Sequence, residues 1–174
     1  MSSLTAPQNS PQARFAIISF DRHPKTSSRI AQRVSERFQS LDWQNLTTIS
    51  VDDLTPELAG QLARVDRAIF IDSPQVGDQV KVKVRALEAH GSEPAGSSRP
   101  GSGHSCDPST LLALAHSAYG RHPQSWWVQV YVPKAELQSP ADIEDALAQA
   151  LKAVEDLMRR SRQPGLEAEK RPGE

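Results

Sequence analysis

The stretch that decides the fold is residues 54–72, LTPELAGQLARVDRAIFID. Thr55-Pro56 is typical of a helix start, because proline is tolerated at the first helical position, where its missing N–H would lack a helical partner anyway. Arg67–Asp72 (RAIFID) follows as a short, mostly apolar run, which predicts a buried strand that ends on a carboxylate. A helix followed by a buried strand is the repeating unit of a parallel sheet.

The same alternation extends to both sides of this stretch. Four other segments have the apolar or alternating pattern of strands, namely residues 14–20 (RFAIISF), 45–51 (NLTTISV), 80–87 (VKVKVRAL) and 125–132 (SWWVQVYV). The third of these alternates strictly with charged residues, which is typical of an edge strand. We therefore expect an α/β fold, a three-layer sandwich in which a mainly parallel twisted sheet of about five strands has helices on both faces.

Three longer helices are predicted from their caps and apolar spacing. Thr26–Ser28 offers an N-cap for the first, and Asp107-Pro108 opens the second, which Gly120 closes. The apolar face of that second helix is expected to include Tyr119. Residues 139–142 (SPAD) resemble a capped start with an acid in the first turn of the last helix.

Composition limits the function classes. The 174 residues suit one domain at 14–162, between polar tails at 1–13 and 163–174 that we expect to be disordered. A net charge of -1 and a pI near 6.5 argue against a nucleic-acid partner, which usually needs a basic face. No apolar run approaches the ~20 residues of a membrane span. The single cysteine, Cys106, permits no internal disulfide, so we expect a reducing, cytoplasmic location.

Asp72 is the strongest candidate site residue. Ligands of such sheets bind outside the carboxyl ends of the strands, where the loop after Phe20, the turn at Asp72 and the stretch around His104 should gather. A structural role for Asp72, capping the turn at Ser73-Pro74, is the competing interpretation. His104 stands just before a helix start, where a cation is disfavoured and a neutral, metal-binding imidazole is favoured, although an exposed loop histidine is the commoner case.

Several motifs, taken in order, resemble the nickel-hydrogenase maturation endopeptidases. Residues 54–72 are similar to that family's helix-then-strand signature, in which the strand ends at a metal-binding aspartate. His104–Gly120 (HSCDPSTLLALAHSAYG) is similar to its ligand histidine followed by a Leu/Ala-rich helix ending in Tyr-Gly, and residues 126–151 resemble its last strand and helix. The resemblance implies the family's fold, which is of a phosphorylase/hydrolase-like kind.

It also implies a substrate, a hydrogenase large-subunit precursor or a related metalloprotein from which a C-terminal extension is removed, and nickel, bound by the chain or carried by the substrate. Asp72 and His104 would be the metal ligands, since imidazole suits nickel and a carboxylate adds charge. No residue is assigned a catalytic role.

The chain departs from the family near its N-terminus. The family's first strand continues into a Gly-Asn-x-x-x-x-Asp-Asp/Glu-Gly loop whose second acid is a metal ligand, whereas Ser27 and Ser28 stand at the two acidic positions here. A serine hydroxyl is neutral and a poor replacement, so Ser28 is a degenerate ligand position. Asp21 and His23, in the same loop, are possible substitute ligands.

Three hypotheses follow. The chain is a maturation endopeptidase with a rearranged site, or a catalytically inactive relative that serves as a binding or chaperone module in metalloenzyme maturation. The third hypothesis, an unrelated small α/β binding domain, requires the ordered motifs to be coincidental.

Overall fold

A five-stranded sheet forms the centre of the molecule. The computed structural model describes residues 13–21, 29–41, 43–74, 79–89, 106–134 and 138–161. The strands are β1 (Phe15–Phe20), β2 (Leu46–Val51), β3 (Arg67–Asp72), β4 (Lys81–Leu87) and β5 (Gln124–Tyr131). Their order across the sheet is β2-β1-β3-β5-β4, with β4 antiparallel to β5 and the other pairs parallel. The predicted mainly parallel sheet, with an edge strand at residues 80–87, is therefore confirmed.

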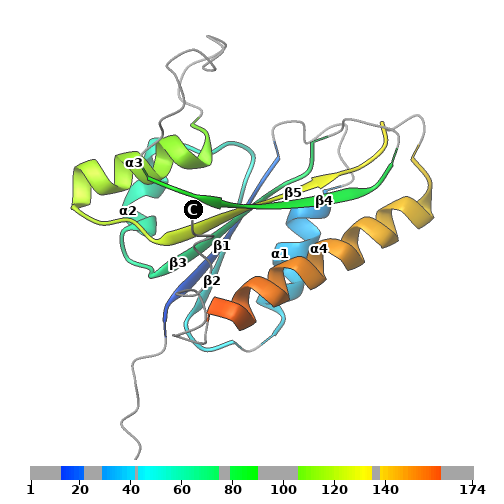
Figure 1. The fold of residues 1–174 in the computed structure, drawn as a ribbon, viewed down its shortest axis with the longest axis horizontal. Helices are drawn as coiled ribbons and strands as arrows, with labels where there is room; N and C mark the ends of the chain where they lie inside the picture. Colours follow the sequence, from blue (N-terminus) through cyan, green and yellow to red (C-terminus); the bar gives the residue numbers. More distant parts are fainter. Residues whose placement is uncertain are drawn as a thin grey trace, which may run out of the picture.

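Helices cover both faces of the sheet (Figure 1). On one face lie α1 (Ile30–Gln39) and α4 (Pro140–Ser161). On the other lie the 3-10 turn η1 (Pro56–Leu58), the short helix α2 (Ala59–Leu62) and α3 (Pro108–Tyr119). The three-layer α/β sandwich expected from the sequence is what the structure shows. Within the described residues, no helix is long and apolar enough to cross a membrane.

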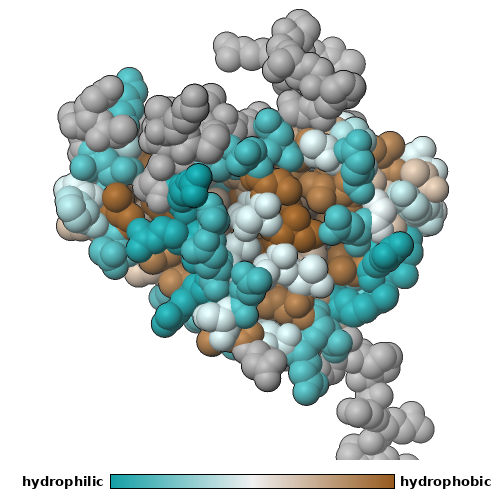
Figure 2. Space-filling view, turned by 180° about the vertical axis from the view of Figure 1, so that it is seen from behind, coloured by the Kyte–Doolittle hydropathy of each residue, from teal (hydrophilic) through white to brown (hydrophobic). Residues whose placement is uncertain are grey.

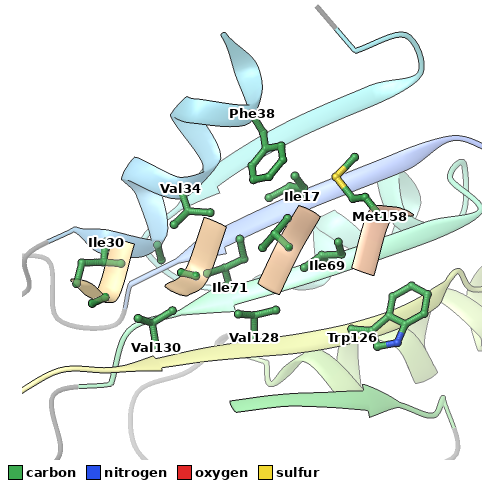
Figure 3. Close-up of a cluster of buried hydrophobic side chains, with 14 of the residues drawn as sticks. Ile17, Ile30, Val34, Phe38, Ile69, Ile71, Trp126, Val128, Val130 and Met158 are labelled. Carbon is green, nitrogen blue, oxygen red and sulfur yellow. The ribbon is translucent and has the colours of Figure 1, made fainter. Parts of the chain in front are cut away.

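Alternation along the strands divides the core into two clusters. In β3, the odd-numbered residues Ile69 and Ile71 face α1 and α4, while Ala68 and Phe70 face α2 and α3. Figure 3 shows the first cluster, in which side chains of the sheet meet Ile30, Val34 and Phe38 of α1 and Met158 of α4. All of these helix residues are at most 1% exposed, and residues 68–71 of β3 are each 0% exposed, so both faces of the strand are sealed.

Local cap chemistry fixes two of the helices as predicted. At the start of α3, the Asp107 carboxylate accepts a hydrogen bond from the backbone N–H of Thr110 at 2.8 Å, and Gly120 ends the helix with φ 72°. At the start of α4, one carboxylate oxygen of Asp142 accepts hydrogen bonds from the backbone N–H and the hydroxyl of Ser139. These hydrogen bonds hold the pKa of Asp142 below its usual value.

Two local predictions are wrong. The cap of α1 is Arg29, in a left-handed conformation (φ 53°) and without a side-chain cap bond, because the helix begins at Ile30 and Ser28 stands one residue too early. Thr26–Ser28 themselves lie outside the described residues. Tyr119 is 57% exposed rather than in the core, because α3 ends there and its ring lies over α2, with the hydroxyl 2.9 Å from the place of a Cβ on Gly60.

The amino ends of the strands are tied by a charged cluster. Asp66, just before β3, forms ion pairs with Arg14 before β1 (3.3 Å) and with Arg121 before β5 (3.1 Å). Side-chain and backbone hydrogen bonds from Arg14 lower the pKa of Asp66 to about 2. This cluster aligns three neighbouring strands at the end opposite to Asp72.

The rear of the molecule, seen in Figure 2, has hydrophobic surface in its middle and hydrophilic residues around it. A cavity of about 460 Å³ lies between the edge strand β2 and α2, with Ile49 and Val65 among its apolar lining residues and Arg14 and Arg64 among its charged ones. It lies near the amino ends of the strands, away from the candidate site described next.

Candidate functional site

Asp72 is the last residue of β3, the middle strand of the sheet. Its neighbours β1 and β5 run parallel to β3, so all three end at the same edge. The side chain of Asp72 is half-buried and shares the face of Ala68 and Phe70, toward α2 and α3. The fold therefore holds this carboxylate at the carboxyl edge of the sheet, as the sequence predicted.

Trp127 of β5 binds this carboxylate. Its indole N–H donates a hydrogen bond to Oδ1 of Asp72 at 2.9 Å. In the register of the two strands Trp127 stands opposite Phe70, so the indole reaches one pleat along the same face to meet the aspartate. The ring of Phe20, fully buried at the end of β1, lies 6.3 Å from the Trp127 ring. Three parallel strands thus contribute to one arrangement around Asp72.

A positive charge lies against the same indole. The guanidinium carbon of Arg85 is 4.4 Å from the centroid of the Trp127 ring, directly across the β4–β5 pair. Such a contact contributes about 0.5–1 kcal/mol where it is exposed to water. Arg85, Trp127 and Asp72 therefore form a continuous series from the edge strand to the middle strand.

This arrangement is suited to presenting an oriented carboxylate. An indole donor fixes the plane of a carboxylate without neutralising it, which is the role of the outer partners of metal ligands. Asp72 therefore has the position and the support of a ligand or of a group that orders a substrate. The hydrogen bond from Trp127 joins the Asp72 carboxylate to a neighbouring strand, in addition to any role in the turn at Ser73-Pro74.

Asp21 lies at the same edge but in a different surrounding. It lines a cavity of about 260 Å³ at the ends of β1 and β2, together with Ser19, Arg29, Gln32, Ser50 and Asp52 among other residues. Asp72 is not among the residues that line this cavity. This cavity therefore does not join Asp21 to Asp72, and the substitution of Asp21 for the lost ligand stays a prediction.

Cys106 marks where the described chain resumes before α3. Its backbone N–H donates to the carbonyl of Leu54 at 2.8 Å, which anchors this point of the chain close to the second cluster of the core. Burial raises the pKa of the Cys106 thiol, and the charges of Asp107 and Glu57 raise it further. A raised pKa keeps the free thiol protonated at neutral pH and makes it a weaker nucleophile.

The other predicted site residues, His23, Ser28 and His104, lie outside the described residues. Among the residues that the structure does describe, no group of three or more His, Cys, Asp or Glu side chains could hold a metal ion. Asp72 and Asp21 are thus the two predicted ligands whose surroundings at the sheet edge can be described.

Trp127 and Arg85 are site residues that sequence reasoning missed. Trp127 lies in the aromatic strand segment at residues 125–132, a pattern that indicates packing, and its ring does pack on Phe20. The sequence indicates part of this arrangement, since the alternation of residues 80–87 predicts that Arg85 lies on an edge strand. It does not predict that this strand pairs with β5, or that β5 pairs with β3.

Comparisons with known proteins place the fold. No known family profile matches the sequence, and no curated protein matches it. Among solved structures, the hydrogenase-maturating endopeptidase HybD of E. coli superposes with a TM-score of 0.60 at 17% identity, over 85% of this chain and 93% of that one. The [NiFe] hydrogenase maturation protease HycI of Thermococcus kodakarensis KOD1 gives a TM-score of 0.58 at 14% identity, over 86% and 95%.

A hydrogenase 2 maturation peptidase from a Thaumarchaeota archaeon is also similar, with a TM-score of 0.56 at 15% identity over 83% of this chain and 97% of that one. Nearly the whole length of each of these proteins is matched. The chain therefore has the fold of the hydrogenase maturation proteases.

Proposed function

We propose that this protein is a hydrogenase maturation protease-like protein that acts on the C-terminal region of a nickel-containing hydrogenase large-subunit precursor. The observation that carries the proposal is the position of Asp72, held by Trp127 at the end of the middle strand of this fold. The resemblance of the sequence motifs gives the same residue a metal-recognition role. The likeness in fold supports the proposal without identifying a substrate.

In this proposal nickel belongs to the substrate. The Asp72 carboxylate approaches the nickel site or the peptide to be cut, and the Trp127 indole keeps that carboxylate oriented. His104 is proposed as the imidazole partner, and Asp21 or His23 as replacements for the acid lost at Ser28. Hard carboxylate and borderline imidazole donors are a suitable pair for Ni²⁺. We also propose a cytoplasmic location, since the chain has a single cysteine.

The alternative function is a binding or chaperone module without peptidase activity. It is favoured by Ser28 at the position of the family's acidic ligand. In this alternative Asp72 serves recognition of the metal-loaded precursor and no bond is cut.

A cleavage assay separates the two functions. Purified wild type is incubated with nickel-loaded large-subunit precursors, and release of the C-terminal peptide is followed by mass spectrometry. The peptidase proposal expects release by wild type, a loss of at least tenfold in Asp72→Ala, and no change in Asp53→Ala, a matched loss of an exposed carboxylate. Stable precursor binding without release is the result expected of the alternative, and absence of both binding and release refutes both functions.

Calorimetry then tests the ligand set. Nickel is titrated at pH 7.5 into wild type, Asp72→Ala, His104→Ala and the double variant Asp21→Ala, His23→Ala. A resident site predicts binding that the first two changes abolish, and the double variant reports on the replacement ligands. Nickel that binds equally to all four proteins contradicts the proposed ligands.

A further inference from the structure

One face of the edge strand β4 carries a row of three cations. Lys81, Lys83 and Arg85 are every second residue of the strand, so they project from the same face, and all three are exposed. The face is the one that carries Trp127 and Asp72, because Arg85 stands opposite Trp127 in the register. The basic row therefore runs alongside the candidate site, since Arg85 stands opposite Trp127 and Lys83 stands opposite Gln129, the β5 partner of Asp72.

Aromatic rings of β5 support two of these cations. Arg85 lies over Trp127 at 4.4 Å, and the ammonium of Lys83 lies over Tyr131 at 4.9 Å from the ring centroid. A long cationic side chain that rests on a ring loses less conformational freedom on binding a ligand than one that extends into water. The charges of the row are thus preorganised along a line, with a spacing set by the strand.

In the part of the chain that the structure describes, the outer side of β4 is an open sheet edge. Among the described residues, β4 pairs with β5 alone and no strand follows it in the sheet, as Figure 1 shows at the near side of the molecule. An edge strand presents unpaired N–H and C=O groups that can pair with another extended chain. On the opposite face of the same strand Val84 is 44% exposed, so an apolar contact is available between the positions of the cations.

We propose that β4 is a docking edge for an acidic, extended segment of a partner protein, with acidic side chains at every second position and apolar side chains between them. The segment adds a strand to β4, its acids meet Lys81, Lys83 and Arg85, and an apolar residue covers Val84. The row of cations lies alongside Trp127 and Asp72, so a segment docked on it brings its own protein to the candidate site. The identity of that protein as the precursor rests on the proposed function. The chemistry of docking does not depend on it.

A row of cations on an edge strand can also arise for two different reasons, which the test below separates from docking. Lysines on an edge strand prevent aggregation, in which case no acidic ligand binds. Cations with aromatic rings also suit single-stranded nucleic acid. The peptide is favoured because the cations follow the period of a strand along an open edge, while the chain as a whole has a net charge of -1.

The test uses the full chain and synthetic ligands. Binding is measured by fluorescence anisotropy with a labelled peptide of alternating Glu and Val, with a peptide of the same composition in which the Glu residues are consecutive, and with an alternating Gln-Val peptide. A ten-nucleotide single strand of mixed sequence is the fourth ligand. We expect the alternating Glu peptide to bind at least about fivefold more tightly than the other three.

Variants then locate the site. Replacing the row (Lys81→Gln, Lys83→Gln, Arg85→Gln) is expected to lower the affinity for the alternating Glu peptide about tenfold, since each exposed charge contributes modestly. The control replaces three exposed cations on the helices of the other face (Arg37→Gln, Lys152→Gln, Arg160→Gln), with the same change in net charge and no expected loss.

Equal affinity for the alternating and the block peptide, or equal effects of the two triple variants, overturns the proposal. Tighter binding of the oligonucleotide overturns it in favour of nucleic acid. The relative affinities of wild type for the four ligands already test the proposal, so it stays testable if the row variant fails to fold. No arm uses nickel or a precursor, so failure here is separate from failure of the proposed function.

Discussion

Replacing Trp127 by phenylalanine removes the N–H that binds Asp72 and keeps most of the ring that packs on Phe20. A hydrogen bond to a charged group contributes about 1.5–3 kcal/mol. Asp72 is half-buried, so water replaces part of what is lost, and we expect a loss of about 1 kcal/mol in the free energy of unfolding. For a chain of this size that corresponds to a decrease in Tm of about 2–4 °C.

A double-mutant cycle isolates the Trp127–Asp72 interaction from other effects of each change. Unfolding in urea is followed by circular dichroism for wild type, Trp127→Phe, Asp72→Ala and the double variant. We expect a coupling energy of about 1 kcal/mol between the two positions. The matched control pairs Asp72→Ala with Trp43→Phe, whose ring packs on Phe38 at 6.3 Å on the other side of the sheet, and should give a coupling within about 0.5 kcal/mol of zero. Zero coupling for Trp127 as well would refute the contact on which the candidate site is built.

The remaining predictions concern the framework and the thiol. Asp66→Asn should destabilise the protein by about 1 kcal/mol at pH 7, less than the full pKa shift implies because its side chain is 38% exposed. Because its folded pKa is lowered, this contribution should be present above pH 3.8 and disappear as the pH falls toward about 2, which unfolding curves of wild type and variant at several pH values would reveal. A pH-independent difference would contradict a role for the ion pairs. Gly120→Ala should cost about 1 kcal/mol in thermal melts through its positive φ alone, since nothing lies within 4 Å of an added Cβ, and a neutral result would mean that the turn relaxes. Asp107→Ala should also cost about 1 kcal/mol by loss of the α3 cap, whereas Asp107→Asn should largely preserve it. Cys106 should react slowly with iodoacetamide at pH 7.5 and reach half its maximal rate at a pH above the usual 9.0, in contrast to the fast, pH-insensitive reaction of a catalytic thiolate.

Much of the fold was predictable because its signals are local. The apolar runs at β1 and β3, the Asp107 cap with Gly120 at the other end of α3, and the alternation of β4 each depend on neighbouring residues. Errors arose where a helix end depends on its surroundings. Tyr119 has core spacing, but it is the last residue of α3 and its ring lies over α2 at the surface.

The candidate site was predictable in part for the same reason. Asp72 ends an apolar strand, and the local sequence is enough to predict that position. Its contact with Trp127, 55 positions away, depends on β5 lying beside β3 in one particular register, since a shift by one residue would turn the indole to the opposite face. Strand order and register are set by the packing of the whole sheet, and so Trp127 and Arg85 could not be assigned from the sequence.

The most direct test of the central claim is the preference of this protein for a nickel-loaded precursor. The affinities of wild type and Asp72→Ala for nickel-loaded and nickel-free large-subunit precursor are measured by surface plasmon resonance, with the precursor immobilised. Asp53→Ala is the matched control. We predict that wild type and Asp53→Ala bind the nickel-loaded form at least tenfold more tightly, and that Asp72→Ala loses this preference. Equal affinity of wild type for the two forms, or a preference that survives in Asp72→Ala, would contradict a role of the Asp72 edge in hydrogenase maturation.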